Sequence, residues 1–488
     1  MRGKNVLVLG MGETGLSMAK WLLRKEANLR AADSRTAPPC LDALKRILPE
    51  SGIFTGGFAP DAFANIDLIA ISPGVALAER QVQQAINQGI PVAGDMELFI
   101  WALEEKWESG EQGERGDYGA PRPKIVAITG SNGKTTVTAM VGAMVKNAGW
   151  DAEVAGNIGP AVLDALMQRQ DSGKLPQAWI LEVSSFQLET TRSLHADAAA
   201  VLNLSEDHFD RYAGMADYAV AKARIFSAGA DGGNNASGGV QILNREDSLV
   251  REMALPGRKQ ITFGLDPPPG DSDFGLMRQG EDIWLAQGKT RLMKTSELRV
   301  AGLHNTANAL AALALCRAIA LPFEPLLQAL REFRGLPHRM EKVAAFGGIT
   351  FYDDSKGTNV GATVAALNGM AQRVVLIAGG DGKGQDFSPL ADPVAEHARA
   401  VVLIGRDAEK IAAAIQHRGV PLHHAATMEE AVGKSFALAR KGDAVLMSPA
   451  CASFDMFRNY AHRAEAFVAA VKHAETGNLA NIHDASNR

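Results

Sequence analysis

The stretch IVAITGSNGKTT, residues 125–136, indicates the fold of this chain more directly than any other segment. Apolar residues typical of a buried strand run into a loop with Gly130 and Gly133, and a helical pattern follows. Backbone N–H groups bind phosphate oxygens where such a loop enters a helix. Lys134 can reach the β- and γ-phosphates, and the Thr135 hydroxyl can bind Mg²⁺. The stretch therefore predicts an ATP site at the end of a strand in a parallel sheet.

This loop departs from the strict phosphate-loop pattern, which has glycine where this chain has Ile128. A plain glycine turn before a helix would explain the glycines, but it requires neither the lysine nor the two threonines that follow. We therefore keep the ATP site as the interpretation and treat the loop as a variant of the pattern.

Outside this stretch, strand-like runs alternate with helical periodicity along nearly the whole chain. The clearest runs are residues 6–9, 374–378, 401–404 and 444–447. This alternation is typical of parallel sheets covered by helices on both faces, so the predicted fold class is α/β. A length of 488 residues predicts three domains, because an ordinary domain has about 100 to 200 residues.

Two breaks in composition suggest where these domains meet. Residues 104–123 (EEKWESGEQGERGDYGAPRP) are polar and rich in glycine, and RGLPHR around Pro337 precedes a new strand at residues 349–352. We expect domains at residues 1–118, 119–336 and 337–488. The loops 229–239 and 267–273 are expected to be surface insertions that carry no chemistry.

The composition excludes several classes of protein. Fifty basic and 55 acidic residues give a net charge of −5, which argues against nucleic acid or a membrane surface as a partner. The three cysteines form no CxxC pair, which favours a reducing compartment over a zinc or disulfide framework. The first apolar run is too short for a signal peptide, and no stretch reaches the roughly 18 apolar residues of a membrane helix. We expect a soluble cytoplasmic protein.

A second glycine motif lies near the amino terminus. Gly10, Gly12 and Gly15 form a GxGxxG pattern between a strand and a helix, and Asp33 ends the next strand. This pattern predicts a nucleotide or phosphate ligand but does not identify it. An NAD-dependent oxidoreductase is one alternative, although it leaves the ATP loop unexplained. A non-catalytic nucleotide-binding switch is another alternative.

Further polar residues follow strand-like runs, where parallel sheets bind ligands. Glu182 ends one run and is positioned to reach a metal held by the phosphate loop, and His208 lies among three acids after another run. The loops 354–359 (DSKGTN) and 379–384 (GGDGKG) each carry a lysine beside glycine, which suits a carboxylate or phosphate. Capping turns and solvated side chains are the alternative explanation for each feature taken alone.

Taken together, the motifs resemble the Mur ligases of peptidoglycan synthesis. They occur in the order TGSNGKTT, LEVSSFQLE, NLSEDHFDRY, HNTANALAA, LPHRME, DSKGTN, GGDGKG and SPACASFD. The segments GMGETGLS, ADSR, ISPGV and GDMELF, together with SPACASFDMF, are most similar to the branch that adds D-glutamate to UDP-N-acetylmuramoyl-L-alanine. The resemblance implies a Rossmann-like domain for the uridine nucleotide, a central P-loop-type ATPase domain with a parallel sheet, and a C-terminal Rossmann-like domain.

The resemblance also implies roles for individual residues, which we carry over position by position. The residues for the UDP-sugar are Glu13, Thr14, Ser34, Arg35, Ser72, Gly74, Asn157 and His208. Those for ATP are Gly130, Ser131, Asn132, Gly133, Lys134, Thr135, Thr136, Asn305, Asn308, Arg339 and Asp354. Those on the amino-acid side are Thr358, Lys383, Ser453 and Tyr460, and the catalytic set is Lys134, His208, Lys222 and Lys356.

The implied reaction activates a carboxylate as an acyl phosphate, which the amine of the incoming amino acid then attacks. The implied cofactors are ATP and Mg²⁺, with Thr135, Glu182, His208 and Lys222 as metal ligands. Lys222 would serve as a carbamate, because the family carbamylates a lysine at this position. The expected partners are the two substrates alone, with no nucleic acid or membrane, and we expect a monomer.

Overall fold

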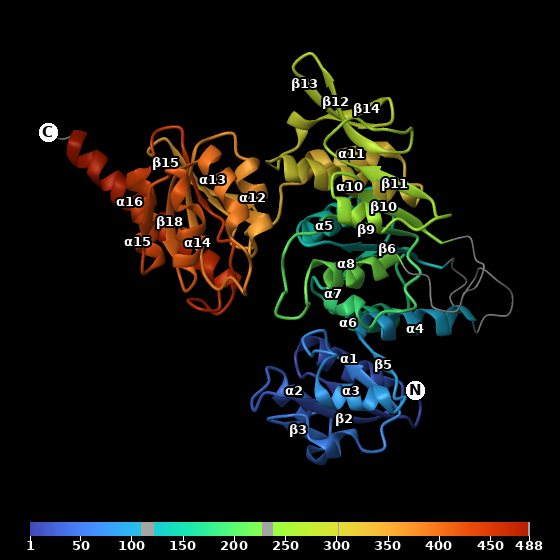
Figure 1. The fold of residues 1–488 in the computed structure, drawn as a ribbon. Helices are drawn as coiled ribbons and strands as arrows, with labels where there is room; N and C mark the ends of the chain where they lie inside the picture. Colours follow the sequence, from blue (N-terminus) through green and yellow to red (C-terminus); the bar gives the residue numbers. More distant parts are fainter. Residues whose placement is uncertain (109–121, 227–237, 301, 487–488) are drawn as a thin grey trace.

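The computed structural model describes residues 1–108, 122–226, 238–300 and 302–486. The chain forms three α/β regions, each built around its own sheet (Figure 1). The predicted fold class is therefore confirmed. Among the described residues, no helix is both long and apolar enough to cross a membrane.

The N-terminal region has a five-stranded parallel sheet in the order β3-β2-β1-β4-β5. Its apolar strands are buried on both faces, as expected for a parallel sheet between helices. The loop from β1 into α1 carries the first glycine motif at the carboxyl edge of this sheet. The elements are β1 (Asn5–Leu9), α1 (Glu13–Arg24), β2 (Asn28–Asp33), α2 (Leu41–Lys45), β3 (Ile53–Thr55), β4 (Leu68–Ile71), α3 (Arg80–Asn87), β5 (Val92–Ala93) and α4 (Asp95–Glu108).

The central region has a nine-stranded sheet in the order β14-β13-β12-β11-β10-β9-β6-β8-β7. Strands β6 to β12 pair in parallel, whereas β12, β13 and β14 form antiparallel hairpins at one edge. The expected parallel sheet is therefore mixed. The elements are β6 (Lys124–Thr129), α5 (Lys134–Asn147), β7 (Ala152–Gly156), α6 (Val162–Asp171), β8 (Ala178–Glu182), α7 (Ser185–Leu188), β9 (Ala198–Val201), α8 (Met215–Ala223), β10 (Val240–Asn244), α9 (Ser248–Glu252), β11 (Gln260–Phe263), β12 (Phe274–Gln279), β13 (Asp282–Gln287), β14 (Thr290–Lys294), α10 (Leu303–Ala318) and α11 (Phe323–Glu332).

The C-terminal region has a six-stranded sheet in the order β15-β16-β20-β17-β18-β19, in which only β15 is antiparallel to its neighbour. The loops after β16, β17 and β20 all lie at the carboxyl edge of this sheet. The elements are β15 (Glu341–Phe346), β16 (Ile349–Asp353), α12 (Val360–Asn368), β17 (Val374–Gly379), α13 (Ala391–His397), β18 (Ala398–Ile404), α14 (Ala408–Ile415), β19 (Leu422–His424), α15 (Met428–Leu438), β20 (Ala444–Met447) and α16 (Tyr460–Ser486).

The structure changes two of the sequence expectations. The expected linker 104–123 begins too early, because helix α4 continues to Glu108; its residues 109–121 lie outside the described residues. Strand β15 also precedes the strand that we expected to open the third domain. The loop 229–239 lies almost entirely outside the described residues, and the loop 267–273 connects β11 to β12.

The two junctions between these regions differ in character. The N-terminal and central regions share one apolar core, in which Phe99 of α4 contacts Trp179 of β8 edge-on at 4.9 Å between ring centroids. The central and C-terminal regions meet through polar side chains instead. Arg339 donates a hydrogen bond to the Thr135 hydroxyl at 2.8 Å, and the Asn132 and Asn359 amides bond to each other.

Candidate functional site

The first glycine loop opens onto a cavity of about 560 Å³ at the carboxyl edge of the N-terminal sheet. The loop and helix pack closely here, since a Cβ on Gly15 would lie 1.8 Å from the Gly10 carbonyl oxygen. Seven of the eight residues expected to bind the UDP-sugar line this cavity; the eighth, His208, does not. The seven are Glu13, Thr14, Ser34, Arg35, Ser72, Gly74 and Asn157.

Both carboxylate oxygens of Asp33 accept hydrogen bonds from other groups of the protein. One carboxylate oxygen accepts hydrogen bonds from the Met11 N–H and the Arg35 guanidinium at 2.7 Å, and the other accepts two from Arg35 at 2.9 Å. Burial alone would raise the pKa of Asp33, but these hydrogen bonds lower it to about 2. A dinucleotide-binding acid must accept hydrogen bonds from the ribose hydroxyls, so this geometry disfavours the NAD interpretation.

The second glycine loop connects β6 to α5, and both of its glycines have positive φ, 153° for Gly130 and 84° for Gly133. A Cβ on Gly133 would lie 2.5 Å from the Asn308 side-chain oxygen, so this position requires glycine. Lys134 is the first residue of α5, and its ammonium donates to the carbonyls of Gly130 and Ser131 at 2.7 and 2.9 Å. The lysine therefore lies folded back over its own loop.

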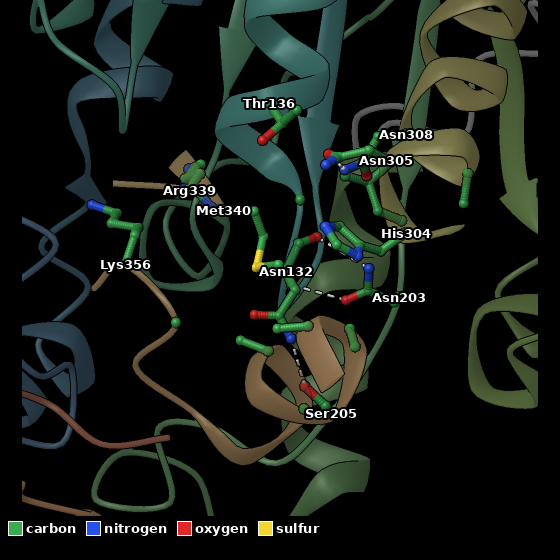
Figure 2. Close-up of a pocket in the computed structure, with 18 of the residues that line it drawn as sticks. Asn132, Thr136, Asn203, Ser205, His304, Asn305, Asn308, Arg339, Met340 and Lys356 are labelled. Atoms are coloured by element: carbon green, nitrogen blue, oxygen red, sulfur yellow. Dashed lines mark hydrogen bonds between the residues drawn. The ribbon is translucent and has the colours of Figure 1, made fainter. Parts of the chain in front are cut away.

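A cavity of about 290 Å³ adjoins this loop (Figure 2). Asn132 lies between Asn203 and Ser205 and bonds to both, and the Asn305 and Asn308 amides face the same space. Arg339 and Asp354 reach the cavity from the C-terminal region, so two sheets enclose it. Seven of the residues expected to bind ATP line this cavity: Asn132, Gly133, Thr136, Asn305, Asn308, Arg339 and Asp354.

Asp354 is an unusual acid in this wall. It lies buried after β16, and its carboxylate accepts hydrogen bonds from the Ser448 hydroxyl at 2.8 Å and the Met340 N–H at 3.3 Å. Burial raises the pKa of Asp354 to about 7, although Ser448 and Arg339 act in the opposite direction. A bound cation or a nearby charge would therefore decide its protonation near neutral pH.

A third cavity, of about 500 Å³, lies between the first two. Glu182 lines it from the end of β8, and one of its oxygens accepts a hydrogen bond from the Asn157 amide at 2.6 Å. The other oxygen is buried and has no partner within the described part of the chain. An unpaired carboxylate oxygen beside a phosphate loop suits Mg²⁺, and His208 and Thr135 line the same cavity.

His208 follows β9 in a turn where its φ is 59°, a left-handed value that is uncommon outside glycine. Its imidazole lies 3.6 Å from the Asp207 carboxylate and 4.7 Å, centroid to centroid, from the Phe186 ring. Burial lowers the pKa of His208, Asp207 raises it, and nearby lysines lower it further. These influences favour a neutral imidazole, which is the form that binds metal.

Lys222 lies on α8 with its side chain 1% exposed. Its ammonium donates to the Gly130 carbonyl at 3.0 Å, the same carbonyl that accepts from Lys134, and lies 4.5 Å from the centre of the Tyr218 ring. Burial lowers the pKa of Lys222 well below its ordinary value, and Lys134 lowers it further. A solvated surface lysine is therefore excluded, and the neutral amine is favoured.

The C-terminal region supplies the remaining expected residues of the third cavity. Lys356, Thr358, Lys383 and Tyr460 line it, with the Lys356 ammonium 3.8 Å from the centre of the Tyr460 ring. Lys383 lies 4.0 Å from Asp207 of the central region. Ser453 is buried after β20 and lines none of the three cavities.

The three cavities form a row because they share walls. Asn157 and Gly159 belong to the first and third, and the second and third share Asn132, Gly133, Arg339 and Lys356. Several lining residues were not expected from the sequence, among them Gln187, Asp207, Asn244, Phe263, His304 and Asn359. Gln187, Asp207, His304 and Asn359 lie within motifs that we had noted, but nothing in the sequence distinguishes a lining residue from its neighbours.

Three family models match successive parts of the chain. They describe the Mur ligase MurD-like N-terminal domain at residues 4–94, the Mur ligase middle domain at 128–316, and the Mur ligase glutamate ligase domain at 338–451. A protein from Nitrosospira multiformis, named UDP-N-acetylmuramoylalanine--D-glutamate ligase, is 67% identical over 99% of both chains. A protein of the same name from Nitrosomonas europaea is 64% identical over 96% of both chains.

A solved structure also shares the fold. UDP-N-acetylmuramate-alanine ligase MurC from Thermotoga maritima superposes with a TM-score of 0.57 over 96% of this chain and 99% of that one. The two sequences are 17% identical, so this likeness concerns the arrangement of the three regions alone.

Proposed function

The chain belongs to the Mur ligase family, and from that premise we propose that it joins D-glutamate to UDP-N-acetylmuramoyl-L-alanine. The reaction uses ATP, forms an amide bond, and releases ADP and phosphate in the synthesis of peptidoglycan precursors. The observation that supports this most directly is the row of three cavities with shared walls. A nucleotide-sugar in the first cavity and ATP in the second would bring their reactive ends together in the third.

The first step transfers a phosphoryl group. An oxygen of the alanyl carboxylate attacks the γ-phosphorus of ATP, the bond to the bridging oxygen breaks, and an acyl phosphate and ADP form. Lys134, at the start of α5, and the loop N–H groups would offset the negative charge gathered there. Arg339, which reaches the Thr135 hydroxyl from the C-terminal region, would add a second cation only when the two regions are together.

The second step forms the amide. The amine nitrogen of D-glutamate attacks the acyl carbon, loses a proton, and phosphate departs with the bonding electrons. Lys356, Thr358, Lys383 and Tyr460 are the candidates for holding the amino acid, because they line the third cavity from the C-terminal side. Lysine ammonium groups suit the carboxylates of glutamate. Enclosure between two sheets would exclude water, which hydrolyses acyl phosphates.

The residues present also fit Mg²⁺. Thr135, Glu182 and His208 are the candidate ligands, with the unpaired oxygen of Glu182 as the strongest indication. When bound, Mg²⁺ would neutralise phosphate charge and align the γ-phosphate. Around it, the protein's own groups hold ATP and the carboxylate in contact.

We further propose that Lys222 is carbamylated. A neutral amine is needed for its nitrogen to bond to the carbon of CO₂, after which a proton leaves and a carbamate anion remains. Two observations support this: the burial of the side chain, and the sharing of one carbonyl with Lys134. Two ammonium groups on one acceptor repel, whereas a carbamate beside Lys134 would attract it.

The test is phosphate release from ATP with the nucleotide-sugar and a panel of D- and L-amino acids. Release should require both UDP-N-acetylmuramoyl-L-alanine and D-glutamate. Equal rates with D-alanine or a diamino acid would contradict the proposed specificity, and no release with any pair would contradict ligation. Tight NADH binding without UDP-sugar binding would favour the oxidoreductase alternative.

The proposal extends to the setting of the reaction. A monomer would suffice for the reaction, because the described residues of one chain line all three cavities. The proposed compartment is the cytoplasm, and the proposal includes no nucleic acid or membrane partner. Sedimentation of the purified chain with both substrates would test the monomer.

A further inference from the structure

Arg211 lies where the N-terminal and central regions meet, three residues after His208. Its side chain is 13% exposed, and its guanidinium forms two hydrogen bonds to the Glu189 carboxylate, at 3.2 and 2.5 Å. A third N–H donates to the Pro73 carbonyl of the N-terminal region at 3.3 Å. The guanidinium also lies 4.7 Å from the centre of the Phe186 ring. One side chain therefore contacts the N-terminal region at Pro73 and the α7 segment of the central region at Phe186 and Glu189.

Two of these contacts lead to the proposed reaction site. The centre of the Phe186 ring lies 4.7 Å from the centre of the His208 ring and 4.7 Å from the Arg211 guanidinium. The backbone N–H of Arg211 also donates to the His208 carbonyl at 2.9 Å, in the turn where His208 has its left-handed φ. Such a backbone conformation costs free energy and persists only where surrounding contacts hold it. The backbone N–H of Arg211 makes one of those contacts, and its guanidinium packs against the Phe186 ring beside the imidazole.

The remaining contact leads to the nucleotide cavity. Pro73 lies between Ser72 and Gly74, and all three residues line that cavity. The Ser72 hydroxyl donates to the Gly10 carbonyl at 3.1 Å, so this loop is tied to the first glycine loop. A ligand that orders residues 72–75 would fix the position of the Pro73 carbonyl relative to Arg211.

We propose that Arg211 is a positioning residue that couples occupation of the nucleotide cavity to the orientation of His208. When the cavity is filled, the ordered Pro73 carbonyl holds the guanidinium, and the guanidinium holds the Phe186 ring, which lies against the His208 imidazole. The forked geometry of arginine is required, because the guanidinium must bond the Glu189 carboxylate and the Pro73 carbonyl at the same time. The inference rests on the proposed function for the identity of the nucleotide.

A purely structural ion pair is the alternative, and kinetics distinguish it. Arg211→Gln should lower kcat by about 10- to 100-fold, which is typical for loss of a group that orients a metal ligand, while KM for the nucleotide-sugar stays nearly unchanged. Arg211→Lys should recover only part of kcat. Arg192→Gln is the matched control, because that arginine is exposed and lies three residues after Glu189 in the chain. Wild-type kcat in Arg211→Gln would overturn the proposal.

Hydrogen–deuterium exchange with UDP as the only added ligand gives a readout independent of activity. In the wild type, UDP should protect residues 72–75 and also residues 205–212, which a nucleotide in the first cavity does not touch. In Arg211→Gln, protection of 72–75 should remain and that of 205–212 should disappear. Glu189→Gln, which keeps the arginine but weakens its anchor, should give a smaller loss and serves if Arg211→Gln does not fold.

The outcomes separate the two proposals. If UDP protects neither segment in the wild type, the proposed nucleotide site is wrong. If it protects residues 72–75 alone in the wild type, or both segments equally in the variants, the nucleotide site stands and the coupling through Arg211 is wrong.

Discussion

The two glycine loops of this protein have the same local architecture but different chemistry. Each follows a buried strand, opens a helix and lines a cavity at the carboxyl edge of its sheet. The first has no lysine, and Arg35, which lines its cavity, is hydrogen-bonded to Asp33. The second has Lys134 within the loop and Lys222 beneath it, both bonded to the Gly130 carbonyl. Under the proposed function, the first loop would retain a ligand, whereas the second would prepare one for reaction.

The largest expected effect comes from Lys134→Ala, which removes the cation of the second loop. ATP turnover should fall by about 10³-fold, the upper range for loss of one charge-stabilising donor, because nothing replaces the ammonium near the γ-phosphate. Calorimetric binding of the UDP-sugar should be nearly unchanged, since that ligand is assigned to the first loop. Lys146→Ala, at the exposed end of the same helix, is the control. Loss of UDP-sugar binding in a folded Lys134→Ala protein would break the comparison.

The next effect is expected for Lys222→Ala. Activity should drop on the order of 100-fold or more, because a metal ligand and the counter-charge to Lys134 are lost together. Acetate or formate should restore part of it by occupying the space of the carbamate, and the measurement is the rate against carboxylate concentration. Lys259→Ala replaces an exposed lysine of the same region and serves as the control. Its activity should equal that of the wild type and should not change when carboxylate is added. Full activity of Lys222→Ala without any additive would remove this lysine from the mechanism.

A smaller effect should follow from Asp33→Asn in the first loop. The amide cannot hold the Arg35 guanidinium as the carboxylate does, and a charged hydrogen bond contributes about 1.5–3 kcal/mol. KM for the nucleotide-sugar should therefore rise about tenfold or more, while kcat stays near the wild-type value. Asp42→Asn, exposed in α2, provides the control. A fall in kcat with an unchanged KM would show that the first loop takes part in the reaction.

The smallest effect concerns Asp354 and the pH dependence of stability. Its pKa is raised to about 7 by burial, whereas an aspartate in the unfolded chain titrates near 4, so the folded state binds its proton more tightly. The stabilisation of the folded state by protonated Asp354 is fully present below about pH 4 and is lost as pH rises to about 7. The melting temperature of ligand-free wild type should therefore fall relative to Asp354→Asn between pH 5 and 8. Parallel curves for the two proteins would contradict the raised pKa.

Much of this site could be predicted from the sequence because its chemistry lies in short motifs. Gly130, Gly133 and Lys134 fall within five consecutive residues between β6 and the start of α5, so their spacing alone indicates phosphate binding. The expected residues of the first cavity likewise fall in three short segments, residues 13–14, 34–35 and 72–74, with Asn157 as the exception. The hairpins of β12 to β14 and strand β15 were not predicted, since short edge strands alternate weakly between polar and apolar residues.

The sequence by itself determined the α/β class, the two glycine loops and the family, because these depend on residue types at fixed local spacing. Only the tertiary structure decided how the charges are satisfied. Asp33 accepts a hydrogen bond from the Met11 N–H of the first glycine loop, and one Glu182 oxygen is left unpaired. Lys222 shares a carbonyl with a lysine 88 positions earlier. The physical reason is that hydrogen-bond saturation, burial and pKa depend on neighbours brought together from distant segments. Arg339 meets Thr135 across 204 positions, which no local pattern encodes.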